Sequence, residues 1–195
     1  MSDAETAALV GATGGAGTTR LCVELAATLA RAGEDVAVLD AALATQGLEQ
    51  YLPGHVERDL TDLLRASDPD PSDCGVDLPV EAPGEITAWP AYAAFEGIAR
   101  AKAPAAAKRL DDVDATVDCT LENERPGADG SVPDGDATVP ESETRTVAAA
   151  PVCDDPAPGP FAPAVASAAE ALFDCSLSLS FPDDGRFGED LLPGR

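Results

Sequence analysis

A glycine-rich stretch near the start of the chain is the part of the sequence best suited to chemistry. It reads Gly11-Ala-Thr-Gly-Gly-Ala-Gly17, and Thr18, Thr19 and Arg20 follow it directly. A glycine loop that leads from a buried strand into a helix directs several backbone N–H groups toward one concavity at the positive end of the helix dipole. Four glycines in seven residues exceed what a tight turn needs. The stretch therefore predicts an anion site, best suited to phosphate groups.

The segments around this loop form a strand-helix-strand pattern. Residues 7–10 are a short apolar run, residues 18–32 carry apolar side chains at helical spacing before Gly33, and residues 35–40 are a second apolar run ending at Asp40. These features predict a strand, a helix and a second strand in that order. In such units the two strands are parallel and the crossover is right-handed. The loop is then expected where the first strand meets the helix, with Asp40 at the end of the second strand.

The rest of the chain alternates weaker strand and helix signals with loops. We expect strands at 85–90, 114–119, 144–150 and 177–181, and helices at 57–65, 91–110 and 164–174. Acidic loops rich in proline and glycine are expected at 67–84, 122–143 and 154–163. Alternating strands and helices predict an α/β fold, a three-layer sandwich with a mainly parallel sheet, formed by one domain over residues 1–195.

Composition and charge exclude several classes of function. The 195 residues include 36 Asp and Glu against 12 Lys and Arg, which gives a formal net charge of −24. This charge repels phosphate backbones and anionic lipid headgroups, so we expect no nucleic-acid binding through a basic surface. With His55 as the single histidine, histidine-based triads and histidine-rich metal sites are excluded. The five cysteines are scattered without a C-x-x-C pair, so neither a zinc site nor a disulfide framework is expected.

The basic residues themselves are unevenly divided. Only Lys102 and Lys108 are lysines, against ten arginines. Beside so much acid, this balance is typical of halophilic proteins from a cytoplasm very rich in salt, as in haloarchaea, and it predicts unfolding when salt is removed. No apolar run approaches about 18 residues, so a cytoplasmic protein is expected. Residues 187–195 are acidic and end in Pro-Gly-Arg, which predicts no amphipathic membrane anchor.

Residues 8–54 resemble the MinD/ParA family of P-loop ATPases, and the likeness is best within residues 7–66. The family loop usually reads G-K-G-G-x-G-K-[ST]-[ST], and the matching stretch here runs from Ala12 to Arg20. The resemblance implies a P-loop NTPase-like fold that binds ATP and Mg²⁺, with the hydroxyl of Thr19 reaching the metal. The nucleotide-binding residues that it implies are Gly14, Gly15, Ala16, Gly17, Thr18, Thr19 and Arg20.

The chain departs from the family at the residues that hydrolysis needs most. The signature lysine falls on Thr13, the phosphate-loop lysine falls on Thr18, and an aspartate that helps place the attacking water is Ala42. In the family, the acids that match Asp40 and Asp118 serve the Mg²⁺ and water side of the site, so these two are candidate catalytic residues. Because a lysine and Mg²⁺ supply most of the positive charge in phosphoryl transfer, efficient ATP hydrolysis is not expected.

Three hypotheses follow from these residues. The first is a degenerate MinD/ParA-like P-loop protein with weak or no ATP hydrolysis, which acts by nucleotide-sensitive or nucleotide-independent binding of a protein partner, or as a homodimer. The second is a divergent active ATPase in which Arg20 or a partner's cation substitutes for the lysine. The third is an NAD(P)-binding protein similar to the atypical short-chain dehydrogenases, whose G-A-T-G-x-x-G loop also matches Gly11 to Gly17. In that case Asp40 would bind the ribose, although no Tyr-x-x-x-Lys pair exists around Tyr51 or Tyr92.

Overall fold

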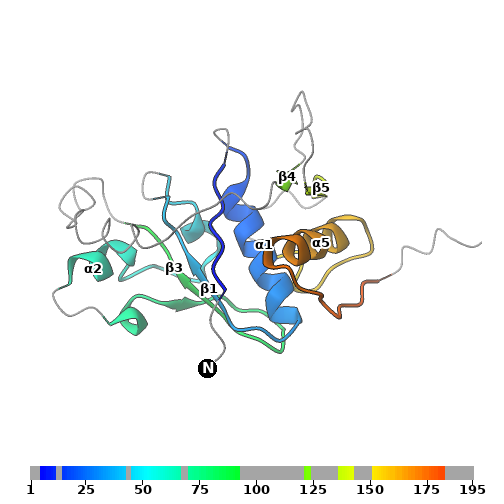
Figure 1. Cartoon of the computed structure of the whole chain (residues 1–195). Coiled ribbons are helices and arrows are strands. Elements are labelled where there is room, and N and C mark those ends of the chain that lie inside the picture. Colours follow the sequence, from blue (N-terminus) through cyan, green and yellow to red (C-terminus); the bar gives the residue numbers. More distant parts are fainter. Residues whose placement is uncertain are drawn as a thin grey trace, which may run out of the picture.

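Two long helices and a small sheet form the centre of the protein. The computed structural model describes residues 5–11, 15–42, 45–66, 70–92, 121–123, 136–142 and 151–182. In chain order the elements are the helix α1 (Thr18–Arg31), the strand β1 (Val36–Leu39), the 3₁₀ helix η1 (Leu48–Tyr51), α2 (Leu60–Arg65), the 3₁₀ helix η2 (Pro71–Asp73), β2 (Val76–Asp77), β3 (Ile86–Trp89), β4 (Leu121–Asn123), β5 (Ala137–Val139) and α5 (Phe161–Phe173). Figure 1 shows α1 between the strands β1 and β3 on one side and α5 on the other.

The described sheet is mixed. β1 and β3 are parallel, with Val36 opposite Ile86, and β2 pairs antiparallel with the other edge of β3. β4 and β5 form a separate parallel pair. The strands expected at 35–40 and 85–90 are thus confirmed, whereas β2, β4 and β5 include residues of segments expected to be loops. The described residues therefore form an α/β protein in which parallel and antiparallel pairing occur in one three-stranded sheet.

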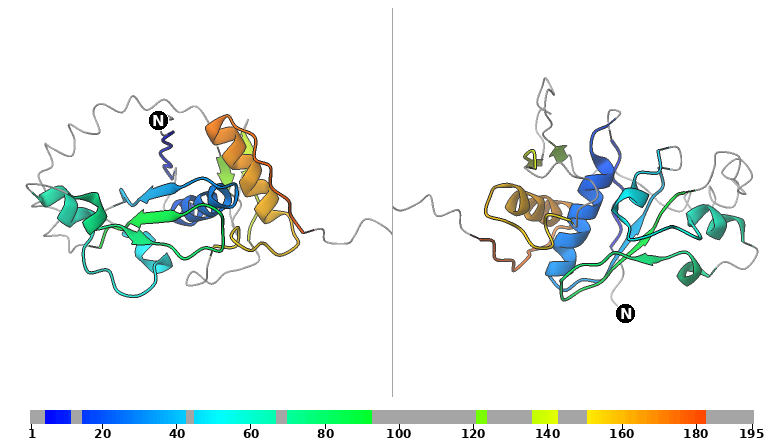
Figure 2. Two further views of the ribbon diagram at one scale, coloured as in Figure 1. Left: turned by 90° about the horizontal axis from the view of Figure 1, so that it is seen from below. Right: turned by 180° about the vertical axis from the view of Figure 1, so that it is seen from behind.

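Helix α1 is buried on both its sheet side and its α5 side. The buried side chains on α1 are Leu21, Val23, Glu24, Leu25, Ala26, Ala27, Thr28 and Ala30. Alanines on both helices keep the side chains small, so the α5 backbone can lie close to α1. Figure 2 shows α5 and α1 side by side in both views, with β1 and β3 on the opposite side of α1. The helix expected at 164–174 is confirmed as α5, which begins earlier, at Phe161.

The helix expected at 57–65 is the short α2, and its start is set by a capping box. Asp59 accepts a hydrogen bond from the Asp62 amide, and the Asp62 side chain accepts one from the Asp59 amide. This reciprocal pair satisfies donors that the first turn of a helix leaves without an intrahelical partner. Asp59 also accepts from the Tyr92 amide at 2.7 Å, which ties α2 to the chain that leaves β3.

Two expected strands are wrong. The structure assigns no strand to residues 5–11 or to residues 175–182, which include the expected strands 7–10 and 177–181. Alternate side chains in both segments, such as Leu9, Leu177 and Phe181, are nevertheless half-buried against the core. At 177–181 the alternation of apolar and polar residues correctly indicated one buried face, whereas the continuous apolar run at 7–10 did not indicate burial, because Val10 is 89% exposed. Within the described residues, neither segment pairs with a neighbouring strand.

A close approach of two backbones positions the starts of β1 and β3. The Gly84 amide donates to the carbonyl of Ala30 at 3.0 Å, and a Cβ on Gly84 would collide with the carbonyl oxygen of Glu34. A side chain at position 84 would push the two segments apart. This contact holds the turn after α1 against the turn before β3, so that the two parallel strands begin together.

Several expected elements lie outside the described residues. These are most of the helix at 91–110, the strands at 114–119 and 144–150, the candidate residue Asp118, and the two lysines. Among the helices that the structure describes, none is long and apolar enough to cross a membrane.

Candidate functional site

The glycine loop enters α1 through two residues in the left-handed conformation. Gly15 has a φ of 73° and Gly17, the residue before α1, has a φ of 82°. This region costs other residues energy because their Cβ approaches the backbone, whereas glycine adopts it freely. Gly17 also offers no side-chain acceptor to the first amides of α1. The loop therefore leads into a helix N-terminus that its own cap residue does not neutralise, which is the local geometry of an anion site.

Thr19 and Asp40 lie on two sides of the loop that follows β1. Thr19 is in the first turn of α1, and a Cβ built on Gly47 would fall 2.8 Å from its hydroxyl oxygen. Asp40 binds the backbone of the same loop. Its Oδ1 accepts a hydrogen bond from the Ala42 amide at 2.9 Å, and its Oδ2 accepts one from the Leu48 amide at 3.2 Å. The structure thus places against one loop the two residues that the resemblance assigns to the Mg²⁺ side of a site.

The fit of this site to Mg²⁺ depends on what its oxygens already bind. Asp40 is 7% exposed, and each of its carboxylate oxygens accepts a backbone N–H. Across the described ranges, no group of three or more His, Cys, Asp or Glu side chains is arranged to hold a metal ion. Mg²⁺ in nucleotide sites is bound by one or two protein oxygens together with phosphates and water. The described residues therefore form no preformed metal site, and because both Asp40 oxygens already accept backbone N–H groups, the Thr19 hydroxyl would be the protein ligand of a Mg²⁺ that arrived with a nucleotide.

Arg20 is engaged by the C-terminal part of the chain. Its Nη2 donates to Ser142 Oγ at 2.8 Å, its Nε lies 3.5 Å from Glu24 Oε1, and its guanidinium carbon lies 5.7 Å from the centre of the Phe161 ring. Glu24 is 2% exposed, and its Oε2 accepts from the Cys153 amide at 2.9 Å. We call these five residues the Arg20 junction. It joins the first turns of α1 to the segment that follows β5, to residues 151–154 and to the start of α5.

The thiol of Cys22, on α1, has low reactivity. Burial raises the pKa of Cys22 to about 11, and the negative charge of Asp40 contributes in the same direction. The thiolate is the nucleophilic form of cysteine, so a thiol with this pKa is almost entirely protonated near neutral pH. The raised pKa therefore does not favour Cys22 as a nucleophile.

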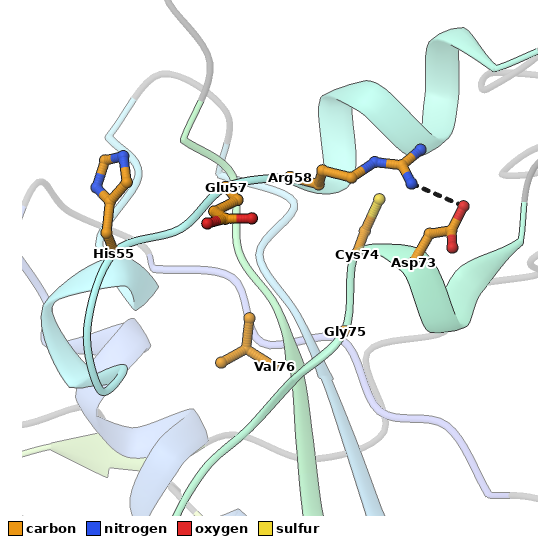
Figure 3. Close-up of a pocket in the computed structure, with 7 residues that line it drawn as sticks. All are labelled: His55, Glu57, Arg58, Asp73, Cys74, Gly75 and Val76. Atoms are coloured by element: carbon orange, nitrogen blue, oxygen red, sulfur yellow. Dashed lines mark ion pairs between the residues drawn. The ribbon is translucent and has the colours of Figure 1, made fainter.

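A concavity of about 200 Å³ lies beside α2 and β2 (Figure 3). It is lined by His55, Glu57, Arg58, Asp73, Cys74, Gly75 and Val76. Arg58 Nη1 and Asp73 Oδ2 form an ion pair of 2.8 Å at one end, and both side chains are about half exposed. In Figure 3 the imidazole of His55 lies at the other end, well apart from the thiol of Cys74. Burial raises the pKa of this thiol, so the hollow holds no activated nucleophile among the residues shown.

The predicted nucleotide-binding residues lie before and in the first turn of α1, and the structure adds contacts around them that the sequence did not indicate. Of the nucleotide-binding residues it predicted, 15–20 are described at the start of α1, whereas Gly14 lies outside the described residues. It missed Gly47, for which a small residue in a loop was the only signal, and Ser142, for which there was none. No family model, no curated protein and no solved structure matches this chain.

Proposed function

We propose that this chain is a degenerate MinD/ParA-like P-loop protein that binds a nucleotide polyphosphate weakly and hydrolyses it slowly or not at all. It would act in the cytoplasm by binding a protein partner or a second copy of itself. One observation carries the proposal: Gly15 and Gly17 form a left-handed glycine loop into α1, while Thr18 stands where a phosphate-binding lysine is expected. The placement of Thr19 and Asp40 around one loop supports it.

The weak binding follows from the charge of the loop. Thr18 can donate a neutral hydrogen bond to a phosphate, whereas a lysine would donate a charge-assisted one, which is about twice as strong. Arg20, the cation next to the loop in the sequence, already contacts Glu24 and Ser142. This engagement favours a degenerate protein over a divergent ATPase. It leaves the phosphates to the backbone amides, which bind anions without supplying a full positive charge.

In the dehydrogenase-like alternative, Asp40 would have to bind the ribose of a dinucleotide. A ribose-binding acid accepts hydrogen bonds from the sugar hydroxyls. In this structure both carboxylate oxygens of Asp40 accept backbone N–H groups of the loop after β1. That arrangement favours the polyphosphate proposal over dinucleotide binding.

The proposal also implies the three-layer sandwich of P-loop proteins. Helix α1 covers one face of β1, on which Val36 and Val38 are half-buried. On the other face of β1, Leu39 is 60% exposed. A second helical layer would cover this face, and the helix expected at 91–110 is its proposed source. Limited proteolysis that cuts rapidly throughout residues 91–110 under native salt would contradict this part of the proposal.

A charge-restoring variant tests the proposed site. The affinity for Mg·ATP is measured by calorimetry in multimolar KCl for the wild type, Thr18→Lys and the neutral control Thr18→Gln. Thr18→Lys is expected to tighten binding about 10- to 100-fold, because a hydrogen bond from a charged donor replaces a neutral one. Thr18→Gln, which is of similar length but uncharged, is expected to produce no such gain. Equal affinities for Thr18→Lys and Thr18→Gln, or tight binding of NADPH without ATP, would overturn the proposal.

Hydrolysis and self-association are tested separately. Phosphate release from Mg·ATP is compared between the wild type and Thr19→Ala, and the expected rate is near background for both proteins. Rapid release that Thr19→Ala abolishes would instead establish the divergent ATPase. Light scattering with and without Mg·ATP reports whether the partner is a second copy of the chain, since a homodimer doubles the measured mass.

A further inference from the structure

Residues 175–181 form an extended segment that follows α5. Leu177 and Phe181 pack against the core, and the side chains between them alternate in exposure. The exposed side chains are Ser176, Ser178 and Ser180. In Figure 1 this segment, coloured orange-red, lies along α5 and near the end of α1. Among the described residues no strand pairs with it, so it has the side-chain alternation of a strand without a neighbouring backbone.

Contacts from α5 and α1 hold the segment in place. The Leu177 amide donates to Glu170 Oε1 at 2.7 Å, and Arg31 Nη2 donates to the Ser180 carbonyl at 3.0 Å. The Arg31 guanidinium carbon also lies 5.1 Å from the centre of the Phe181 ring. A segment that must become ordered during binding loses affinity to that ordering. These contacts therefore prepare the segment to bind another backbone.

The two edges of the segment differ in what they bind. In an extended chain the N–H and C=O of one residue point to one edge, and those of the next residue point to the other. The Leu177 amide is directed to Glu170, so the odd-numbered residues face α5. On the other edge, no hydrogen bond within the described part of the chain uses the amides of Ser176, Ser178 and Ser180. This even-numbered edge therefore offers backbone donors and acceptors in one row.

The segment is uncharged within a strongly acidic chain. Residues 175–181 contain no Asp, Glu, Lys or Arg, although the whole chain has a formal net charge of −24. Copies of such a chain repel one another, and this repulsion opposes contact least where the surface carries no charge. Asp174 precedes the segment, and Pro182, which has no amide hydrogen, follows it. Backbone pairing is therefore limited to residues 175–181.

We propose that the even-numbered edge of residues 175–181 pairs antiparallel with the same edge of a second copy, forming a homodimer with its twofold axis at Ser178. Ser178 then exchanges two backbone hydrogen bonds with its counterpart, and Ser176 does so with Ser180 of the partner subunit. Because the same edge is used on both copies, the assembly closes at two chains. The proposal rests on the self-association that the proposed function leaves open, and it requires no nucleotide.

The charges at the two ends of this edge are complementary. Arg31 lies at the Ser180 end, and among the described residues no carboxylate lies within ion-pair distance of it. Its Nη1 is buried and has no hydrogen-bond partner. The exposed Asp174 lies at the other end. In the antiparallel pair, Ser180 lies opposite Ser176 of the partner subunit, and the partner's Asp174 follows two residues further, about 7 Å along the strand. A second copy thus supplies both a matching backbone and the opposite charge.

Two substitutions at Ser178 test the backbone pairing. The molar mass in multimolar KCl is measured by light scattering over a range of protein concentrations. The wild type and Ser178→Ala are expected to approach twice the monomer mass, because alanine keeps the amide. Ser178→Pro removes the central amide and is expected to raise the dissociation constant at least about tenfold. A wild type that stays monomeric at its highest soluble concentration, or equal dimerisation of Ser178→Pro and Ser178→Ala, would overturn the proposal.

Disulfide cross-linking tests the position of the axis without changing the backbone. Hydrogen-bonded partners in an antiparallel pair have Cα atoms about 5.5 Å apart, a separation that a disulfide spans. In a Cys175→Ala background, Ser178→Cys is expected to form a disulfide between two copies under mild oxidation, which peptide mass spectrometry identifies. Ser167→Cys is the matched control, because Ser167 is exposed on α5. Equal cross-linking at positions 178 and 167, or none at 178, would contradict the proposed axis.

This proposal and the proposed polyphosphate site fail in different ways. If Thr18→Lys and Thr18→Gln bind Mg·ATP equally while Ser178→Pro alone prevents dimerisation, the edge pairing stands and the site is wrong. If Thr18→Lys gains affinity while the wild type stays monomeric, the site stands and the edge pairing is wrong. A dimer that forms only with Mg·ATP and persists in Ser178→Pro would place the interface elsewhere and overturn the edge pairing.

Discussion

Asp40 and Leu48 are joined across the loop after β1, where the Leu48 amide donates to Asp40 Oδ2 at 3.2 Å. The other carboxylate oxygen accepts from the Ala42 amide at 2.9 Å, so one side chain holds both ends of the loop. Gly47, the neighbour of Leu48, lies directly against Thr19. The acid that the resemblance assigned to the Mg²⁺ side of the site therefore also determines the backbone against which Thr19 packs.

Removal of the Asp40 carboxylate should destabilise the protein. Asp40→Ala leaves two backbone amides without their acceptor, which we expect to lower the free energy of unfolding by about 2 kcal/mol. Asp40→Asn keeps one acceptor oxygen and should cost less. Urea denaturation at a fixed multimolar KCl concentration measures both effects. The exposed Asp155 provides the control, and a loss for Asp40→Ala no larger than that for Asp155→Ala would contradict the anchoring role.

The buried position of Glu24 predicts measurable coupling to Arg20. Arg20→Gln alone leaves the Glu24 carboxylate, 3% exposed in its side chain, without its cation. The double variant Arg20→Gln, Glu24→Gln should therefore be more stable than the sum of the two single losses predicts, by about 1 kcal/mol or more. The ion pair of Arg58 and Asp73 provides a matched comparison, because it is shorter but half exposed on both sides. A double-mutant cycle on the Arg58–Asp73 pair should give little or no coupling free energy, since water and salt screen exposed ion pairs.

The raised pKa of Cys22 predicts a loss of stability in alkaline solution. The folded protein keeps this thiol protonated up to about pH 11, whereas the unfolded chain releases the proton near 9.0. The unfolded state thus binds fewer protons within this window, so stability is intact below it and falls as the pH rises through it. Urea denaturation across this range should show a smaller decline for Cys22→Ser, whose hydroxyl does not ionise there. Identical declines in the two proteins would show that Cys22 does not contribute.

The acidic composition predicts that folding depends on salt. A net charge of −24 concentrates carboxylates whose repulsion acts over long range in dilute solution. Salt at about 1 M shortens that range to roughly 3 Å. The Tm should therefore rise by about 10 °C or more between low and multimolar KCl. Sucrose at equal osmolality is the control, because it leaves charges unscreened, and a Tm insensitive to KCl would refute the halophilic interpretation.

The sequence predicted the elements whose side-chain pattern is long and regular. Helical spacing before Gly33 identified α1, the apolar run at 35–40 identified β1, and a weaker strand signal at 85–90 identified β3. The strands β2, β4 and β5 have only two or three residues each, too few for a pattern to emerge. At residues 177–181 the sequence predicted a strand that the structure does not contain. Their alternation reports one buried face, but a strand also requires a neighbouring backbone, which periodicity does not reveal.

The candidate site was predictable where backbone conformation dictates residue type. Left-handed φ values at Gly15 and Gly17 are local properties, so glycines in a loop before a helix indicated them. The partner of Arg20 was not predictable, because Ser142 is 122 residues away in sequence and neither residue carries a local signal of the other. The backbone role of Asp40 was missed for a different reason. A carboxylate at the end of a strand can bind a ligand or a neighbouring loop, and the sequence does not distinguish the two.

Two buried thiols in different parts of the structure can each report when the structure around them opens. Cys153, with no exposed surface, belongs to the Arg20 junction, and Cys74, 2% exposed, lies beside α2 and β2. A thiol reagent reaches either sulfur only when the surrounding structure opens locally. Mass spectrometry of the two modified peptides would therefore time the opening of the α5 side and of the β2 side independently, with no probe added to the chain.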